Sequence, residues 1–294
     1  INFMLYRCFE DCSSLVSVQA NQTTVICDDI FKGCTKLERV RMRNIEAIGS
    51  CAFSDCNSLE VVEFGNIPIS FGRKDVFKNC TNLKYLVIPG GSSFSDSFPM
   101  ICESCSRLQS IIYLGNIYIS VYQSRLGSNA NVYRASDLVN WSDDSFTYTG
   151  NIPRPSYTTK ATPADFQFTK ADFSELHADA GEFQDSVSFT FANNDMSYKV
   201  KIPFKYTIAK ANLTAKVQDA TRNYGDDNPK FAVKYSGFVN GEDEKVLDSP
   251  GTIVTSANRT SNVGNYDIML QGATDNNYNI TPTSGILTIN KVPL

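Results

Sequence analysis

The stretch FEDCSSL at residues 9–15 returns as FKGCTKL (31–37), FSDCNSL (53–59), FKNCTNL (77–83) and CESCSRL (102–108). All five copies keep a cysteine at the fourth position and a leucine at the seventh, and four of them begin with phenylalanine. Successive cysteines are 22, 22, 24 and 25 residues apart. A nearly fixed period of this length is typical of a solenoid, in which each repeat forms one coil and stacked coils bury a shared core.

A short alternating apolar run follows the leucine of each copy and predicts a β-strand. In the second copy Val40 and Met42 alternate with Arg39, Arg41 and Arg43. Because residues two apart in a strand share a face, we expect Val40 and Met42 to point into the core and the arginines to point outward. The initial phenylalanines should fill the core from the opposite wall, on a short helical or 3₁₀ turn. The structural ladder then consists of Cys12, Cys34, Cys56, Cys80, Cys105, Leu15, Leu37, Leu59, Leu83 and Leu108.

The copy IGSCAFSDCNSLEVVEF at residues 48–64 resembles the BspA-like leucine-rich repeats of bacterial surface proteins, whose units read roughly I-x-x-x-A-F-x-x-C-x-x-L-x-x-V. The resemblance covers about residues 1–115. It implies a secreted or surface-anchored binding module, not a catalyst. We therefore expect a location at the bacterial cell surface or outside the cell, with the signal or anchor segment missing from this sequence, as in a truncated chain.

The sequence pattern changes after the repeats. Residues 114–130 look like a last irregular strand and a capping segment, and residues 127–131 look like a linker. From there on, short β-rich runs alternate with Gly, Asn, Asp and Pro, which predicts all-β modules. This part is itself repeated, since PFKYTIAKANL (203–213) aligns with GILTINKVPL (285–294), and YTGNIPRP (148–155) aligns more loosely with YGDDNPKF (224–231). The final KVPL then corresponds to the first strand of a further unit.

The second of these β modules resembles the YGX-type MBG repeats of bacterial surface proteins. The matching residues are Tyr224-Gly225-Asp226, Asn228-Pro229, YSGFVNGEDEKVL (235–247), VGNYDI (263–268) and GILTINK (285–291). The first module is a degenerate relative, with Tyr148-Thr149-Gly150 at the corresponding place. The resemblance implies Ig-like stalk or spacer modules without a catalytic residue.

These patterns predict a mainly β chain. Its fold class is a leucine-rich-repeat solenoid, with short strands and short helical or 3₁₀ turns, followed by two tandem all-β Ig-like modules. The predicted domains are 1–130 for the solenoid with its C-terminal cap, 131–209 for the first, degenerate MBG-type module, and 210–294 for the second, YGX-type module. We expect a monomer.

Composition excludes several classes of function. The net charge is −4, and an acidic chain is a poor nucleic-acid binder, because neutralising phosphates requires a basic surface. No apolar run is long enough to span a membrane. All nine cysteines fall between Cys8 and Cys105, and we interpret the repeated ones as small buried hydrophobes whose thiols satisfy loop backbone groups. The Cys102-x-x-Cys105 pair lacks a second pair, which favours a core substitution over a metal site.

No motif for catalysis, and none for a cofactor, is present. The single histidine, His177, has no sequence partner, and we interpret it as a solvated loop residue. The acidic runs at 226–227 and 242–244 could offer carboxylates to calcium, but they are more simply turn residues. We therefore predict neither an enzyme nor a metal or cofactor site.

The outer face of the solenoid sheet is the predicted binding surface. Carrying the register across copies gives one outward ladder of Ser17, Arg39, Val61, Tyr85 and Ser110, and a second of Gln19, Arg41, Glu63, Val87 and Ile112. One end of this face is cationic and the other is apolar, a combination that often marks a binding site. The candidate residues are Arg39, Arg41, Arg43, Val61, Glu63, Tyr85, Val87 and Ile112. The alternative is that a neighbouring loop or domain covers Tyr85, Val87 and Ile112.

The function that we predict is adhesion. The solenoid face would bind a host matrix protein, a glycan or another cell, and the β modules would act as a spacer. One alternative is a structural scaffold or stalk whose binding resides in regions missing from this sequence. Another is an accessory module of a polysaccharide-processing system, although Glu63 is the only carboxylate on the predicted face and glycosidases need two.

Overall fold

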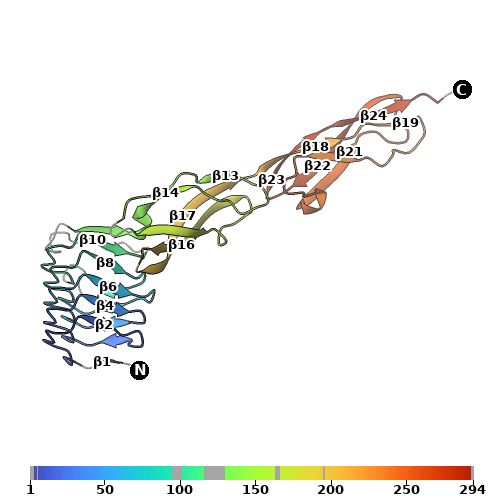
Figure 1. Cartoon of the computed structure of the whole chain (residues 1–294). Coiled ribbons are helices and arrows are strands. Elements are labelled where there is room, and N and C mark those ends of the chain that lie inside the picture. Colours follow the sequence, from blue (N-terminus) through green and yellow to red (C-terminus); the bar gives the residue numbers. More distant parts are fainter. Residues whose placement is uncertain are drawn as a thin grey trace. The chain divides into compact units, whose positions relative to one another are not determined.

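A computed structural model describes residues 3–4, 6–94, 101–115, 130–162, 166–194 and 196–292. Strands dominate it, and the N-terminal repeats stack as regular coils (Figure 1). The chain forms two compact units. The first unit comprises residues 1–142, 156–173 and 186–204, and the second comprises residues 143–155, 174–185 and 205–294.

One wall of the solenoid consists of two parallel three-stranded sheets. The first contains β2 (Ser17–Gln19), β4 (Arg39–Met42) and β6 (Val61–Phe64), and the second contains β8 (Tyr85–Ile88), β10 (Ser110–Tyr113) and β11 (Asn131–Arg134). Within these sheets Arg39 lies opposite Ser17 and Val61, and Tyr85 lies opposite Ser110. The strand register predicted from the repeat period is therefore confirmed within each sheet.

The parallel pairing of the solenoid sheet continues beyond residue 130. Asn131 pairs with Ser110 and Arg134 with Tyr113, so β11 is one more parallel strand of the same sheet. The predicted cap and linker lie mostly outside the described residues. The domain bounds at 130 and 209 stay predictions.

The opposite wall carries a further parallel sheet, of five strands, that the sequence did not predict. It contains β1 (Phe3–Met4), β3 (Val25–Ile26), β5 (Ala47–Ile48), β7 (Ser70–Phe71) and β9 (Ser93–Phe94). Each of these strands has only two residues, which is too short to show an alternating pattern. The signal that could have revealed them is the apolar residue that recurs five or six positions before the phenylalanine of the first four copies: Met4, Ile26, Ile48 and Phe71.

The core between the two walls is built from identical positions in successive coils. Leu37, Leu59 and Leu83 are completely buried, as are the phenylalanines Phe31, Phe53 and Phe77. The phenylalanine rings stack in a column, with 5.4 Å between the ring centres of Phe31 and Phe53 and 5.3 Å between those of Phe53 and Phe77. Leucines and phenylalanines of successive coils thus share one continuous core.

Turns connect the two walls in each coil, and among the described solenoid residues these segments are turns, not helices. In the second copy, the Cys34 amide donates to the Phe31 carbonyl at 3.1 Å and the Leu37 amide donates to the Cys34 carbonyl at 3.0 Å. The residue before the cysteine has a positive φ in all five copies, which explains the predominance of Asp, Gly and Asn there. These residues are Asp11, Gly33, Asp55, Asn79 and Ser104.

The β modules follow. The first contains η3 (Ala135–Leu138), β12 (Val139–Trp141), β13 (Ser145–Thr147), β14 (Tyr157–Thr159), β15 (Gln167–Asp172), β16 (Gly181–Ala192) and β17 (Ser197–Ala209). The second contains β18 (Ala211–Val217), β19 (Ala220–Asn223), β20 (Val233–Ser236), η5 (Glu244–Val246), β21 (Ser249–Thr255), β22 (Gly264–Thr274), β23 (Tyr278–Thr283) and β24 (Gly285–Asn290).

The strand order supports the tandem repeat seen in the sequence. The first module has a four-stranded sheet of order β13-β17-β16-β15, and the second has one of order β19-β24-β22-β21. The first two strands in each order, β13 with β17 and β19 with β24, pair in parallel. Ile208 of β17 lies opposite Phe146, and Ile289 of β24 lies opposite Arg222. The alignment of Ile208 with Ile289 therefore corresponds to a shared topology.

Candidate binding face

The cationic half of the solenoid face is organised around one buried carboxylate. Arg41 donates from Nε to Oε2 of Glu63, and Arg43 donates to Oε1 from Nε at 3.1 Å and from a terminal guanidinium nitrogen at 2.7 Å. The Glu63 side chain is only 4% exposed, whereas that of Arg43 is 55% exposed. The period of the solenoid places Arg41 opposite Glu63, because β4 and β6 pair one coil apart.

Charge on this half of the face is unbalanced. Arg41 and Arg43 contribute two positive charges to it, and Glu63, which contacts both, carries one negative charge. Glu63 contacts two guanidinium groups and therefore restricts their orientations. This preorganisation reduces the side-chain entropy that would be lost when a ligand binds. An arrangement of this kind favours a carboxylate, sulfate or phosphate ligand, which can accept two parallel hydrogen bonds from one guanidinium.

The apolar half of the face is closed. Tyr85 is 9% exposed, and Val87 and Ile112 are completely buried. The Tyr85 ring meets the edge of Phe166 at 5.8 Å, and Phe166 stacks on Phe191 at 4.7 Å. The interpretation of Tyr85, Val87 and Ile112 as an open binding surface is therefore wrong, and its stated alternative, coverage by a neighbouring segment, describes them.

Residues of β16 and β17 complete this cover within the first unit. Tyr198 is buried, and burial, with smaller effects from Glu63 and Tyr85, raises its pKa. Lys199 donates its backbone N–H to Oδ1 of Asn66 at 2.9 Å. A hollow of about 440 Å³ remains beside Arg43, lined also by Asn66 and Asn193. Val61, also named as a candidate, is half-buried, so the open part of the face is the arginine-bearing part.

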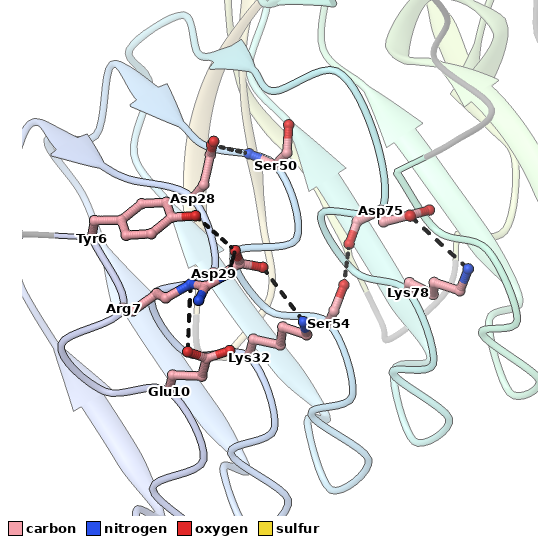
Figure 2. A network of polar contacts seen from close by, with 10 residues as sticks. All are labelled: Tyr6, Arg7, Glu10, Asp28, Asp29, Lys32, Ser50, Ser54, Asp75 and Lys78. Carbon is pink, nitrogen blue, oxygen red and sulfur yellow. Dashed lines mark hydrogen bonds and ion pairs between the residues drawn. The ribbon is translucent and has the colours of Figure 1, made fainter.

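Polar contacts also join the coils at the turns that follow β1, β3, β5 and β7 (Figure 2). Asp29 accepts from Tyr6 at 3.4 Å and from Arg7 at 3.3 Å, and it lies 3.8 Å from Lys32. Asp28 accepts from the Ser50 amide of the next coil at 2.7 Å. These groups bind one another from coil to coil, so we assign them a structural role.

His177 has a partner that sequence reasoning missed. Its Nδ1 lies 2.9 Å from Oδ2 of Asp185, which also accepts from the Tyr206 hydroxyl at 2.8 Å, and its ring stacks on Phe183. Burial alone would raise the pKa of Asp185, but the hydrogen bonds from His177 and Tyr206 lower it. The imidazole is about half exposed, as predicted. Asp185 lies near the start of β16, eight residues after His177 in the sequence.

The cysteine ladder has the predicted chemistry. The thiols of Cys34, Cys56, Cys80 and Cys105 donate to the carbonyls of Phe9, Phe31, Phe53 and Phe77 in the preceding coil, at 3.0, 3.1, 3.1 and 2.9 Å. Cys102 is completely buried, and a hydrogen bond with Cys105, together with burial, raises its pKa. Among the described residues no group of three or more His, Cys, Asp or Glu side chains could hold a metal ion.

The acidic runs also have internal partners. Asp226 accepts from the Asn223 amide at 3.3 Å, and Asp243 caps η5 by accepting from the Lys245 amide at 2.9 Å. Glu242 accepts from two tyrosine hydroxyls. These contacts explain the two runs as turn and junction residues.

The fold defines a leucine-rich-repeat solenoid joined to β-sheet modules. A BspA-type leucine-rich-repeat region matches residues 4–126 in six copies, and an MBG domain of the YGX type matches residues 213–288. The chain therefore combines a BspA-type repeat region with a YGX-type MBG domain, and both domain types fit a surface protein. A search of curated proteins found no match.

Both domain types are typically non-catalytic, and BspA-type proteins are typically secreted or found at the cell surface. In the described part of the chain, no helix has the length and hydrophobicity needed to cross a membrane.

Proposed function

We propose that the protein is an adhesin-like surface protein whose solenoid binds an acidic protein or an acidic glycan through Arg39, Arg41 and Arg43. One observation carries the proposal: two of these guanidinium groups are oriented by a single buried carboxylate, Glu63, while the Arg43 side chain stays 55% exposed on this face. A ligand carboxylate or sulfate would meet donors that are already positioned.

The β modules act as the spacer in this proposal. Only Lys210 separates β17 from β18, so the two modules follow one another almost without a linker. A short connection of this kind suits a stalk, because long flexible linkers would leave the binding face free to fold back.

An accessory role in polysaccharide processing has less support. Both oxygens of Glu63 accept hydrogen bonds from arginines, and the side chain is almost fully buried. A catalytic carboxylate must instead reach the glycosidic bond together with a second one.

The purified chain applied to an array of glycans and matrix proteins tests the proposal. We expect the bound probes to carry carboxylate or sulfate groups, and we expect their binding to weaken as salt increases, because exposed charges are screened within about 8 Å at physiological ionic strength. Binding confined to neutral probes, or binding insensitive to salt, would contradict the proposal. No binding by the purified chain would favour the scaffold alternative, in which regions missing from this sequence make the contacts.

A further inference from the structure

The first β module meets the second through a junction that lies entirely within the second unit. Tyr148 is buried, and its hydroxyl donates to Oε1 of Glu242 at 2.7 Å. The hydroxyl of Tyr278 donates to the other oxygen of the same carboxylate, and the two rings meet edge to face at 5.4 Å. One carboxylate of the second module thus fixes a tyrosine from the first.

Further contacts join the two modules at this junction. Ala180 donates its backbone N–H to Oδ1 of Asn277 at 2.8 Å, and Lys210 donates from Nζ to the Asp275 carbonyl at 2.8 Å. Gly150, with a φ of 72°, lies so close to Asn240 that an added Cβ would be 2.7 Å from the Asn240 Cβ. Each of these contacts pairs a residue between Tyr148 and Lys210 with a residue between Asn240 and Tyr278.

The second module has the same groups at the same places of its own fold. The Tyr148 amide donates to Ala209, the last residue of β17, and the Tyr224 amide donates to Asn290, the last residue of β24. Ala180 directly precedes β16, and Val263 directly precedes β22. Lys210 follows β17 as Lys291 follows β24.

In the second module these places are open. Tyr224 is 47% exposed, compared with 7% for Tyr148, and Val263 is 46% exposed. Gly225 has a φ of 87°, and a Cβ added there would meet no atom within 4 Å. Lys291 is exposed as well. We call this surface, formed by Tyr224, Gly225, Val263 and Lys291, the end face.

We propose that the end face is a docking surface for another β module of the kind formed by residues 211–290, joined in line after Lys291. Such a module carries a carboxylate equivalent to Glu242 for the Tyr224 hydroxyl. It also carries an amide equivalent to Asn277 for the Val263 N–H, and a carbonyl equivalent to that of Asp275 for Lys291. The occupied junction shows that each pair of groups is compatible. The inference does not depend on what the solenoid binds.

An extended chain tests this directly. Residues 1–291 are followed by a second copy of residues 211–290, which repeats the spacing around Lys210. Hydrogen exchange at the Val263 amide is then followed by NMR in the original and extended chains. We expect exchange at Val263 to slow at least about tenfold in the extended chain, which corresponds to a coupling of about 1.4 kcal/mol.

Two substitutions in the extended chain locate the effect. Tyr224→Ala, or Glu242→Gln in the added copy, should return the Val263 exchange rate toward that of the original chain. Ile286→Ala is the matched control, because Ile286 is equally exposed, at 44%, but lies at the start of β24, away from the end face. This variant should leave the slowed exchange unchanged.

Three results would overturn the proposal. One is equal exchange at Val263 in the original and extended chains. Another is an added copy that stays unfolded after Lys291. The same residues, 211–290, fold after Lys210 in the original chain, so this result would show that the end face does not support a following module. The third is dimerisation of the original chain that Tyr224→Ala abolishes, which would assign the end face to a second copy of this chain.

Discussion

At the scale of single residues, the repeated cysteine closes each coil onto the one before it. A thiol is small enough for a fully buried position and still donates a hydrogen bond, here to the carbonyl of a phenylalanine 25 to 28 residues earlier. This role could be predicted from the sequence, because five cysteines at one repeat position cannot each have a separate function. The acceptor, a phenylalanine carbonyl in every case, could not be predicted.

Cys56→Ala should destabilise the solenoid by about 0.5–1.5 kcal/mol, because the substitution removes one of the two donors to the Phe31 carbonyl, the other being the Cys34 amide. Urea unfolding followed by circular dichroism measures the change. Cys8→Ala is the control, since Cys8 is exposed and should leave stability unchanged. Equal stability of the two variants would show that the thiol hydrogen bond contributes nothing.

Two aspartates at equivalent turn positions should respond to substitution with opposite signs. Burial, opposed by the charge of Lys78 and reinforced by Glu103, raises the pKa of Asp75, and Oδ1 of Asp75 is buried without a hydrogen-bond partner. A raised folded-state pKa means that ionisation of Asp75 opposes folding above its ordinary value of 3.8, and that this cost disappears as the pH falls below that value. Asp75→Asn should therefore raise the free energy of unfolding by about 0.5–1 kcal/mol at pH 7, with the gain lost in acid.

The backbone does not oppose this exchange, because asparagine accepts the positive φ of 57° as readily as aspartate does. Asp29→Asn is the matched control: Asp29 has a φ of 56°, but its carboxylate binds Arg7 and Lys32. Its substitution should leave stability unchanged or lower it by up to about 1 kcal/mol. Urea unfolding midpoints of both variants at pH 7 and pH 4 measure these changes. A loss of stability in Asp75→Asn at pH 7 would show that ionisation of Asp75 does not oppose folding.

At the scale of elements, the strands of the solenoid can be predicted from local sequence patterns. The segment that covers β8 cannot be predicted in this way. Alternation after each leucine is enough to place Val40 inside and Arg39 outside. The burial of Tyr85 depends on Phe166, which is 81 residues further along the chain and lies outside the leucine-rich repeats. Periodicity predicts which way a side chain points, but it does not predict whether a later segment of the chain covers that side chain.

Phe166→Ala should destabilise the first unit by about 3–5 kcal/mol, because Phe166 is 3% exposed and contacts both Tyr85 and Phe191. Thermal or urea unfolding measures the loss. Val16→Ala, at an apolar side chain of the same unit that is 48% exposed, should change stability by less than about 0.5 kcal/mol. A Phe166 variant as stable as the Val16 variant would mean that the apolar half of the face is open after all.

At the scale of the whole molecule, the two kinds of repeat could be predicted from the sequence because each one repeats its own period. The contacts of the junction could not, since Tyr148, Ala180 and Lys210 bind partners 94, 97 and 65 residues further along the chain. The comparisons assign the same two domain types, which fit a surface protein. Adhesion through the arginine-bearing face is the proposal that remains to be measured.

The affinity of the strongest array ligand for matched variants of the chain tests that proposal most directly. We predict that the double substitution Arg39→Ala with Arg43→Ala weakens binding at least about tenfold, equivalent to about 1.4 kcal/mol, because both guanidinium groups face the ligand. Lys36→Ala, which removes an exposed cation from the loop before β4, should bind as the original chain does. Undiminished binding by the double variant would contradict the proposal that this face is the adhesive surface.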